Sequence, residues 1–389
     1  MKEDAKIPEF SLFGGPLHKF GIWLGLVREG TNTVRLGLAL GLLAWGVLVV
    51  LALLQGVGHK VFSLGGIGAH VRLLVAIPLF FMCETSVAPR MAEFVRNILG
   101  SGLVPETEMP ALGSDIRRAG RMKDSWLAEV LFLLLAFAFP LFGSVANMPG
   151  GTGSWKSILG QAGGNLTLAN GWYLMFCLPL FRFLILRWLW HLGLWWHFLW
   201  RVKKLKLRLV PTHSDGAAGL GYLEVVQEHF IPFVLAISAV LSAAFAEGIF
   251  AGTMAFETLY SLIPMVLLLV AVLVIGPLLM FSRKLWVCRS TGLDEYMAMA
   301  SRYVHAFDGK WLRDESASGE SQLGTADMQS LADLTNSVNV VRNMRLVPAS
   351  RRLMIELAAC VILPMLPLVL LKYPVDQIAA RLFKALTGL

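Results

Sequence analysis

Seven runs of mostly apolar residues recur along this chain, and each has the length expected of a helix that crosses a lipid bilayer. Such a helix needs about 20 mostly apolar residues. The runs cover residues 36–54, 69–88, 126–146, 172–203, 230–250, 259–281 and 354–371. The last run carries Pro364 and Pro367, so a re-entrant segment is the alternative there. We therefore predict an all-α transmembrane bundle of about seven spans, with cytoplasmic helical extensions and amphipathic interfacial helices.

The composition excludes an ordinary soluble fold. Charged residues make up only 15% of the 389 residues, whereas a soluble domain carries about 25% because its surface must be wetted. The net charge of +8 is also compatible with nucleic-acid binding, but the basic residues concentrate in alternate loops, as membrane orientation requires. We therefore expect the lipid bilayer as partner and no nucleic acid, and self-assembly into a homo-oligomer is left open.

The basic residues also predict an orientation. From the N-terminus onward, the segments that flank the seven runs hold 5, 1, 6, 1, 5, 0, 10 and 3 Lys and Arg residues, where the fifth count runs from Arg201 to Arg208 and so includes the end of the fourth run. Loops rich in these residues stay in the cytoplasm. The pattern places the N-terminus in the cytoplasm of a bacterium and the C-terminus on the periplasmic side of its inner membrane. If the last run re-enters, the C-terminus returns to the cytoplasm.

Four regions follow from this arrangement. Residues 1–35 form a cytoplasmic or interfacial segment, 36–281 a six-span bundle with cytoplasmic loops, 282–353 a cytoplasmic helical region, and 354–389 the last span with an amphipathic helix. Apolar residues recur at helical spacing in three further stretches, which we expect to be amphipathic helices. They are residues 15–27, 326–344 and 375–386. The Gly- and Ser-rich stretch 314–324 is expected to be a linker.

Charged residues inside the apolar runs are the first candidate site. A charge at mid-membrane costs about 2.5–3.5 kcal/mol on insertion scales and usually faces the bundle or water. Arg182 falls near the middle of the fourth run, and Arg187 lies deeper, at the depth of Glu84 in the second run. We expect Glu84 to pair with one of these arginines. All three are candidates for permeation or gating; the structural alternative is a buried partner or a side chain that snorkels to the interface.

The loop after the fourth run is the second candidate site. Thr212, His213, Asp215, Gly216 and Gly219 combine an imidazole, a carboxylate and a glycine-rich backbone. Such a loop can act as a base, a ligand site or a pH sensor. Its spacing matches no phosphate-binding loop, dinucleotide fingerprint or zinc site, so we predict no metal, no cofactor and no assigned catalytic residue. The alternative is a capped turn whose glycines allow close packing.

The same loop carries a resemblance. The stretch PTHSDGAAGLGYL, together with PLFRFLILRWLWHLGLWWHFLWRV before it, resembles a family of uncharacterised bacterial multi-span inner-membrane proteins with a Thr-His-Pro-Asp element before a Gly-rich run. Ser214 stands where that family has proline. GGPLHKFGIWLGLVR and LGTADMQSLADLTNSVNVVRNMR resemble the same family. The overall arrangement is similar to seven-span insect odorant-receptor-type ion channels, a likeness that implies tetramers whose last helix lines the pore.

Three functions are consistent with these patterns. The leading hypothesis is an ion or small-solute channel or transporter that uses the intramembrane charges. One alternative is an enzyme at the membrane interface that uses His213 and Asp215. The other is a membrane scaffold or sensor whose cytoplasmic helices bind a partner.

Overall fold

The protein is a polytopic bundle of α-helices. The computed structural model describes residues 10–23, 25, 27, 33–143, 167–313 and 326–372, and within these ranges the regular structure is entirely helical. Six helical stretches are long and apolar enough to cross a membrane: Val34–Leu54, Leu64–Gly100, Leu168–Lys204, Tyr222–Phe250, Phe256–Leu279 and Arg351–Leu371. A seventh apolar helix, α7 (Trp126–Gly143), is shorter. The prediction of a transmembrane helical bundle is confirmed.

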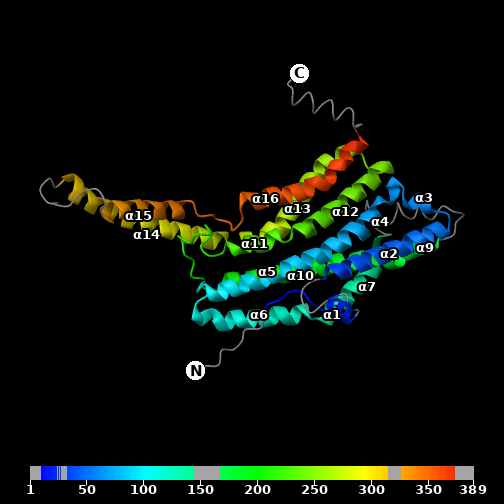
Figure 1. Cartoon of the computed structure of the whole chain (residues 1–389), viewed down its shortest axis with the longest axis horizontal. Coiled ribbons are helices and arrows are strands. Elements are labelled where there is room, and N and C mark those ends of the chain that lie inside the picture. Colours follow the sequence, from blue (N-terminus) through cyan, green and yellow to red (C-terminus); the bar gives the residue numbers. More distant parts are fainter. Residues whose placement is uncertain are drawn as a thin grey trace, which may run out of the picture.

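Two long helices form the centre of the bundle (Figure 1). The first joins a 3₁₀ turn η1 (Leu64–Gly66), α4 (Ile67–His70), a π-helical segment η2 (Val71–Ala76) and α5 (Ile77–Gly100). The second joins α9 (Leu168–Trp172), a π-helical segment η4 (Tyr173–Cys177) and α10 (Leu178–Lys204). Each continuous stretch has 37 residues, and about 55 Å of helix exceeds the ~30 Å hydrocarbon core. Each long helix must therefore tilt or extend beyond the hydrocarbon core.

The remaining spans pack around these two helices. α2 (Val34–Leu54) packs against α5, and α7 packs along α10. α12 (Ile231–Phe250) lies between α5 and the last span, and α13 (Leu259–Leu279) packs against that last span (Figure 1). The contact between α2 and η2 is close, because a Cβ atom at Gly41 would lie 2.4 Å from the Leu73 carbonyl oxygen. A glycine at this position lets the two backbones touch.

The last span is helical along its whole length. α16 (Arg351–Ile362) continues into η7 (Leu363–Leu371), a 3₁₀ helix that contains both prolines. Proline removes a backbone donor and frees the carbonyl one turn earlier. The Ser242 hydroxyl of α12 donates to the Pro364 carbonyl at 2.6 Å and so fixes this segment against the bundle. The sequence-predicted helix over 375–386 lies outside the described residues.

A helical hairpin extends beyond the bundle at one end (Figure 1). It consists of α14 (Ser282–Asp308), with the π-helical turn η6 (Gly309–Arg313), packed against α15 (Ala326–Arg342). The predicted helix over 326–344 is therefore present, while the predicted linker 314–324 lies outside the described residues. The other elements are short or lie along the bundle: α1 (Pro16–Trp23), α3 (Gly58–Val61), η3 (Glu106–Glu108), α6 (Met109–Lys123), α11 (Tyr222–Glu228) and η5 (Phe256–Thr258).

Basic residues gather at the end of the bundle that carries this hairpin. α10 and α13 both terminate there, and the chain that follows each of them is rich in Lys and Arg. We call it the basic end. Its defining residues are Arg201, Lys203, Lys204, Lys206, Arg208, Arg283 and Lys284.

Candidate functional site

Glu84 and Arg187 form a bidentate ion pair in the interior of the bundle. Arg187 Nη1 donates to Glu84 Oε2 at 2.8 Å, and Arg187 Nη2 donates to Glu84 Oε1 at 3.1 Å. The two side chains are only 2% and 3% exposed. α5 and α10 each turn one apolar face inward, and these two residues lie on those faces. The pairing predicted from their common depth is present, and Arg187 is the arginine that makes it.

A second carboxylate and the N-terminal segment complete this site, which we call the Glu84 cluster (Glu84, Glu129 and Arg187). Glu129 of α7 places its Oε1 3.8 Å from Arg187 Nε, and its Oε2 accepts the Leu17 amide at 3.2 Å. The Gly14 carbonyl accepts a further bond from Arg187 Nη2 at 3.1 Å. One arginine therefore faces two carboxylates from different helices.

The N-terminal segment can approach this closely only because of its glycines and aromatic side chains. Gly15 has φ +88°, and a Cβ atom there would lie 2.4 Å from Glu129 Oε1. A side chain would therefore be strained and would displace the carboxylate. Phe10 and Phe13 anchor the segment on α10, with ring centroids 4.4 Å from Phe198 and 5.5 Å from Trp188.

Another group of buried charges lies at the two π-helical segments. We call Arg72, Tyr173 and Glu247 the Arg72 cluster. Arg72 Nη1 donates to the Tyr173 hydroxyl at 2.6 Å, and its Nη2 lies 4.0 Å from Glu247 Oε2. Glu247 Oε1 accepts the Gly68 amide at 2.7 Å. π-helical turns within α-helices often occur at functional sites, and here η2 supplies Arg72 while η4 supplies Tyr173.

Arg182 lies closer to the Arg72 cluster than to the Glu84–Arg187 pair in its electrostatic interactions. It lies on α10 between Tyr173 and Arg187, is half-buried, and is within electrostatic range of Tyr173 and Arg72. The three charges predicted together are therefore split: Glu84 and Arg187 meet, and Arg182 lies toward the Arg72 cluster.

The loop at 212–221 is built around the Asp215 carboxylate. Its oxygens accept backbone amides from Ala217 at 2.8 Å, Gly219 at 3.1 Å and Gly221 at 2.7 Å. His213 Nδ1 lies 2.9 Å from Asp215 Oδ1. Burial by itself raises the pKa of Asp215, but the amides of Ala217, Gly221 and Gly219 outweigh it, so the pKa lies below its ordinary value. This geometry is that of the capped turn.

Two glycines and one alanine of this turn adopt positive φ angles. Gly216 and Gly219 have φ +63° and +97°, a region that costs glycine little, and Ala218 adopts φ 56° between them. The Arg345 guanidinium then holds the turn from outside, through the Asp215 carbonyl at 2.8 Å and Glu224 Oε2 at 2.5 Å. Thr212 touches α14, with its hydroxyl 3.5 Å from the Tyr296 hydroxyl. The loop thus ties the hairpin to the bundle.

Sequence reasoning did not single out Glu129, Arg72, Glu247 or Tyr173 as site residues. A partial signal existed, because Arg72, Glu129 and Glu247 each lie inside an apolar run, where a lone charge requires a partner. Matching every arginine in a run with every carboxylate in a run would have proposed these pairs. Tyr173 and the backbone contacts at Gly14 and Gly68 carry no such signal.

A double-mutant cycle should measure the Glu84–Arg187 interaction. Glu84→Gln and Arg187→Gln should each destabilise the protein by about 3–5 kcal/mol, because each leaves a buried charge unpaired. Arg187→Gln should cost more, since it leaves both Glu84 and Glu129 without their arginine. The double variant should recover a coupling energy of about 0.5–3 kcal/mol, measured by unfolding in detergent micelles. The exposed pair Arg90–Glu93, also 2.8 Å apart, is the matched control. Simple additivity at 84 and 187 would contradict the pairing.

The Asp215 turn should make stability depend on pH. Asp215→Ala should lower the melting temperature at neutral pH, because three partly buried amides lose their acceptor. A fully buried stranded group costs about 1–3 kcal/mol. The folded pKa lies below the unfolded one, so this contribution is complete above the ordinary Asp value of 3.8 and is lost as pH falls through the folded pKa. Melting curves of the wild type and the variant should converge only in strong acid. A difference that persists unchanged there would show that the ionised carboxylate is not what holds the turn.

Comparison with protein-family models, curated proteins and solved structures gives no match. The two resemblances noted in the sequence therefore stay predictions. The function is argued below from the charged clusters and their surroundings.

Proposed function

We propose that this chain transports an ion or a small solute across the bacterial inner membrane and that the Glu84 cluster is its charge-exchange site. The observation that carries this proposal is that two carboxylates face one arginine inside the bundle. Ionisable residues within membrane spans are costly and usually mark ion pathways or proton relays.

The charge balance of the cluster supports exchange with a proton or a cation. Glu84 neutralises Arg187 through two short bonds, whereas Glu129 reaches only Nε, at 3.8 Å. When both carboxylates are ionised, one negative charge is left over at membrane depth, where it is expensive. A proton or a small cation at Glu129 removes this cost. Glu129 is therefore the residue that we expect to load and unload.

The N-terminal segment is placed to control access to this carboxylate. The Leu17 amide binds Glu129 directly, and Phe13 packs beside Trp188, next to Arg187. Opening a path to Glu129 from this side requires residues 10–17 to move. We propose that this segment is the gate on the side of the Glu84 cluster.

The Arg72 cluster supplies a second position along the same pathway. Arg72 and Glu84 are 12 residues apart on one continuous helix, which corresponds to about 18 Å along the helix axis. Tyr173 and Arg187 are separated in the same direction on the other long helix. A shift of one long helix against the other therefore changes both clusters together, as alternating access requires.

The orientation that we propose puts the basic end in the cytoplasm, the N-terminus with it, and the C-terminus in the periplasm. An impermeant maleimide should then label Thr253→Cys in intact cells, because the loop around it holds no basic residue and is exposed. Arg302→Cys, on the exposed surface of α14, should be labelled only after permeabilisation. Cys288 and Cys360 are replaced by serine in both variants, and Cys83 and Cys177 are buried. The reverse labelling pattern would invert the orientation.

Reconstituted vesicles test the transport itself. Vesicles are loaded with a pH-sensitive dye and placed under an imposed potassium potential or a sodium gradient. The pH inside the vesicles should change only when the protein is present. Glu129→Gln should reduce this flux by about tenfold or more, equivalent to ~1.4 kcal/mol per factor of ten, while its amide oxygen still accepts the Leu17 amide. Glu93→Gln, on the exposed side of α5, is the matched control and should leave the flux unchanged.

Two outcomes would overturn the proposal. Full flux in Glu129→Gln would remove the role of the Glu84 cluster. A folded wild-type protein that moves no proton, sodium or potassium would remove the assignment as an ion-coupled transporter, and the interfacial enzyme or the scaffold would become the better hypothesis.

A further inference from the structure

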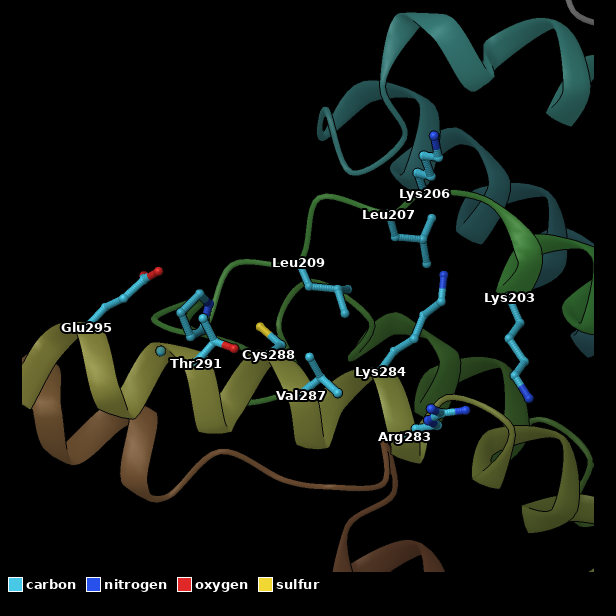
Figure 2. Close-up of a pocket in the computed structure, with 12 residues that line it drawn as sticks. Lys203, Lys206, Leu207, Leu209, Arg283, Lys284, Val287, Cys288, Thr291 and Glu295 are labelled. Atoms are coloured by element: carbon cyan, nitrogen blue, oxygen red, sulfur yellow. The ribbon is translucent and has the colours of Figure 1, made fainter.

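A pocket of about 630 Å³ lies at the basic end, between the end of α10, the chain that follows it, and the first turns of α14 (Figure 2). Four basic side chains and one carboxylate line it, together with mostly apolar residues. The charged members are Lys203, Lys206, Arg283, Lys284 and Glu295. The Glu84 and Arg72 clusters contribute nothing to this pocket, so it is a separate site.

Lys284 is held in place within the pocket. Figure 2 shows it extending from α14 toward the chain after α10, where its Nζ donates to the Leu205 carbonyl at 2.5 Å. Burial and then the charge of Lys203 lower the pKa of Lys284, and Glu108 offsets this only in part. Both lysines line the pocket, Lys284 is partly buried, and the two positive charges repel each other. An anion bound between them would relieve both the repulsion and the lost hydration.

The walls of the pocket are apolar and fixed. Leu207, Leu209 and Val287 line it beside the cations. A Cβ atom at Gly292 would lie 2.7 Å from Pro211 Cβ, so α14 touches the chain after α10 almost backbone to backbone. The groove between them is thereby set by packing, and Lys284 is already held in it, which lowers the ordering cost of binding.

The pocket lies next to the membrane surface. It begins at Lys203, just after Trp196 and Trp200 of α10, and aromatic residues of this kind mark the headgroup level. The span that ends at Leu279 leads directly to Arg283 and Lys284. We therefore expect the basic side chains of the pocket to lie at the depth of lipid phosphates, with an apolar wall on one side.

We propose that this pocket binds a phosphate ester, with the headgroup of an anionic phospholipid as its natural occupant. Lysine and arginine make strong charge-assisted hydrogen bonds to phosphate oxygens. Basic pockets at the ends of membrane helices bind anionic headgroups, and each basic residue near the surface contributes about 1 kcal/mol. The leucines and Val287 suit the glycerol and acyl carbons of a lipid. A soluble phosphate ester shares the same chemistry, and the test separates the two sources.

Cys288 lines the pocket and serves as a built-in reporter. The full chain carrying Cys360→Ser is placed in phosphatidylcholine nanodiscs, with or without an equal part of phosphatidylglycerol, and the alkylation rate of Cys288 by N-ethylmaleimide is measured. Burial and then Glu295 raise the pKa of this thiol, so the reaction is run at mildly alkaline pH. Phosphatidylglycerol should slow the alkylation. A second arm adds glycerol 3-phosphate to the zwitterionic nanodiscs.

Variants show whether the slowing depends on the pocket. Lys203→Gln/Lys284→Gln should abolish it, and in the soluble arm each lysine removed should raise the half-protecting concentration by about fivefold. Lys204→Gln is the matched control, because Lys204 lies over the Trp200 ring and outside the pocket. A cysteine at Val210, which is exposed and outside the lining, is the control for the general surface charge of the nanodisc.

Protection by phosphatidylglycerol alone identifies the lipid headgroup, and protection by glycerol 3-phosphate in zwitterionic nanodiscs identifies a soluble phosphate ester. If the lysine pair does not fold, Lys206→Gln/Arg283→Gln replaces it, since both side chains are exposed. The proposal is overturned if neither phosphate source slows alkylation, or if slowing is the same in the charge-removed variant and at Val210→Cys.

Discussion

A charged side chain inside a bilayer has to find its opposite charge within the protein, and this requirement organises the bundle. Arg187 is satisfied by Glu84 from α5, by Glu129 from α7 and by the Gly14 carbonyl. One guanidinium thus fixes the depth and rotation of three helices and of the N-terminal segment. Apolar contacts alone would allow one helix to slide along another, because neighbouring leucine contacts are similar in energy. A bidentate ion pair forms in only one register and prevents this sliding.

At the basic end the same kind of contact joins separate parts of the chain. Arg345, just after α15, reaches both the Asp215 turn and Glu224 of α11. Arg201 of α10 meets Asp115 of α6 at 2.8 Å. Water competes with these contacts, so they are individually weaker than the buried pair. Together they tie α10 to α6, and the end of α15 to the Asp215 turn and α11.

The sequence predicts the spans well because hydropathy reports directly on where a helix meets lipid. It underestimates the length of the second span, since residues 90–100 form an amphipathic continuation of the helix that packs on protein. The Glu84–Arg187 pair was predictable from the constant rise of a helix, but the choice between Arg182 and Arg187 depends on rotation. The contact of Glu129 with the N-terminal segment was not predicted, and neither was the pocket at the basic end, which forms where α14 packs against the chain after α10. Both depend on contacts between distant segments, for which one sequence has no periodic signal.

The docking of the N-terminal segment has a consequence for how the protein is made. Phe10, Phe13 and Gly14 contact Phe198, Trp188 and Arg187 of α10, which are synthesised roughly 10–40 s later at ordinary rates of translation. During that interval the segment lacks its contacts with α10, although Glu129 of α7 is already present to accept the Leu17 amide. The N-terminal segment is therefore synthesised first but reaches its final position late, and the first spans insert into the membrane before its contacts with α10 can form.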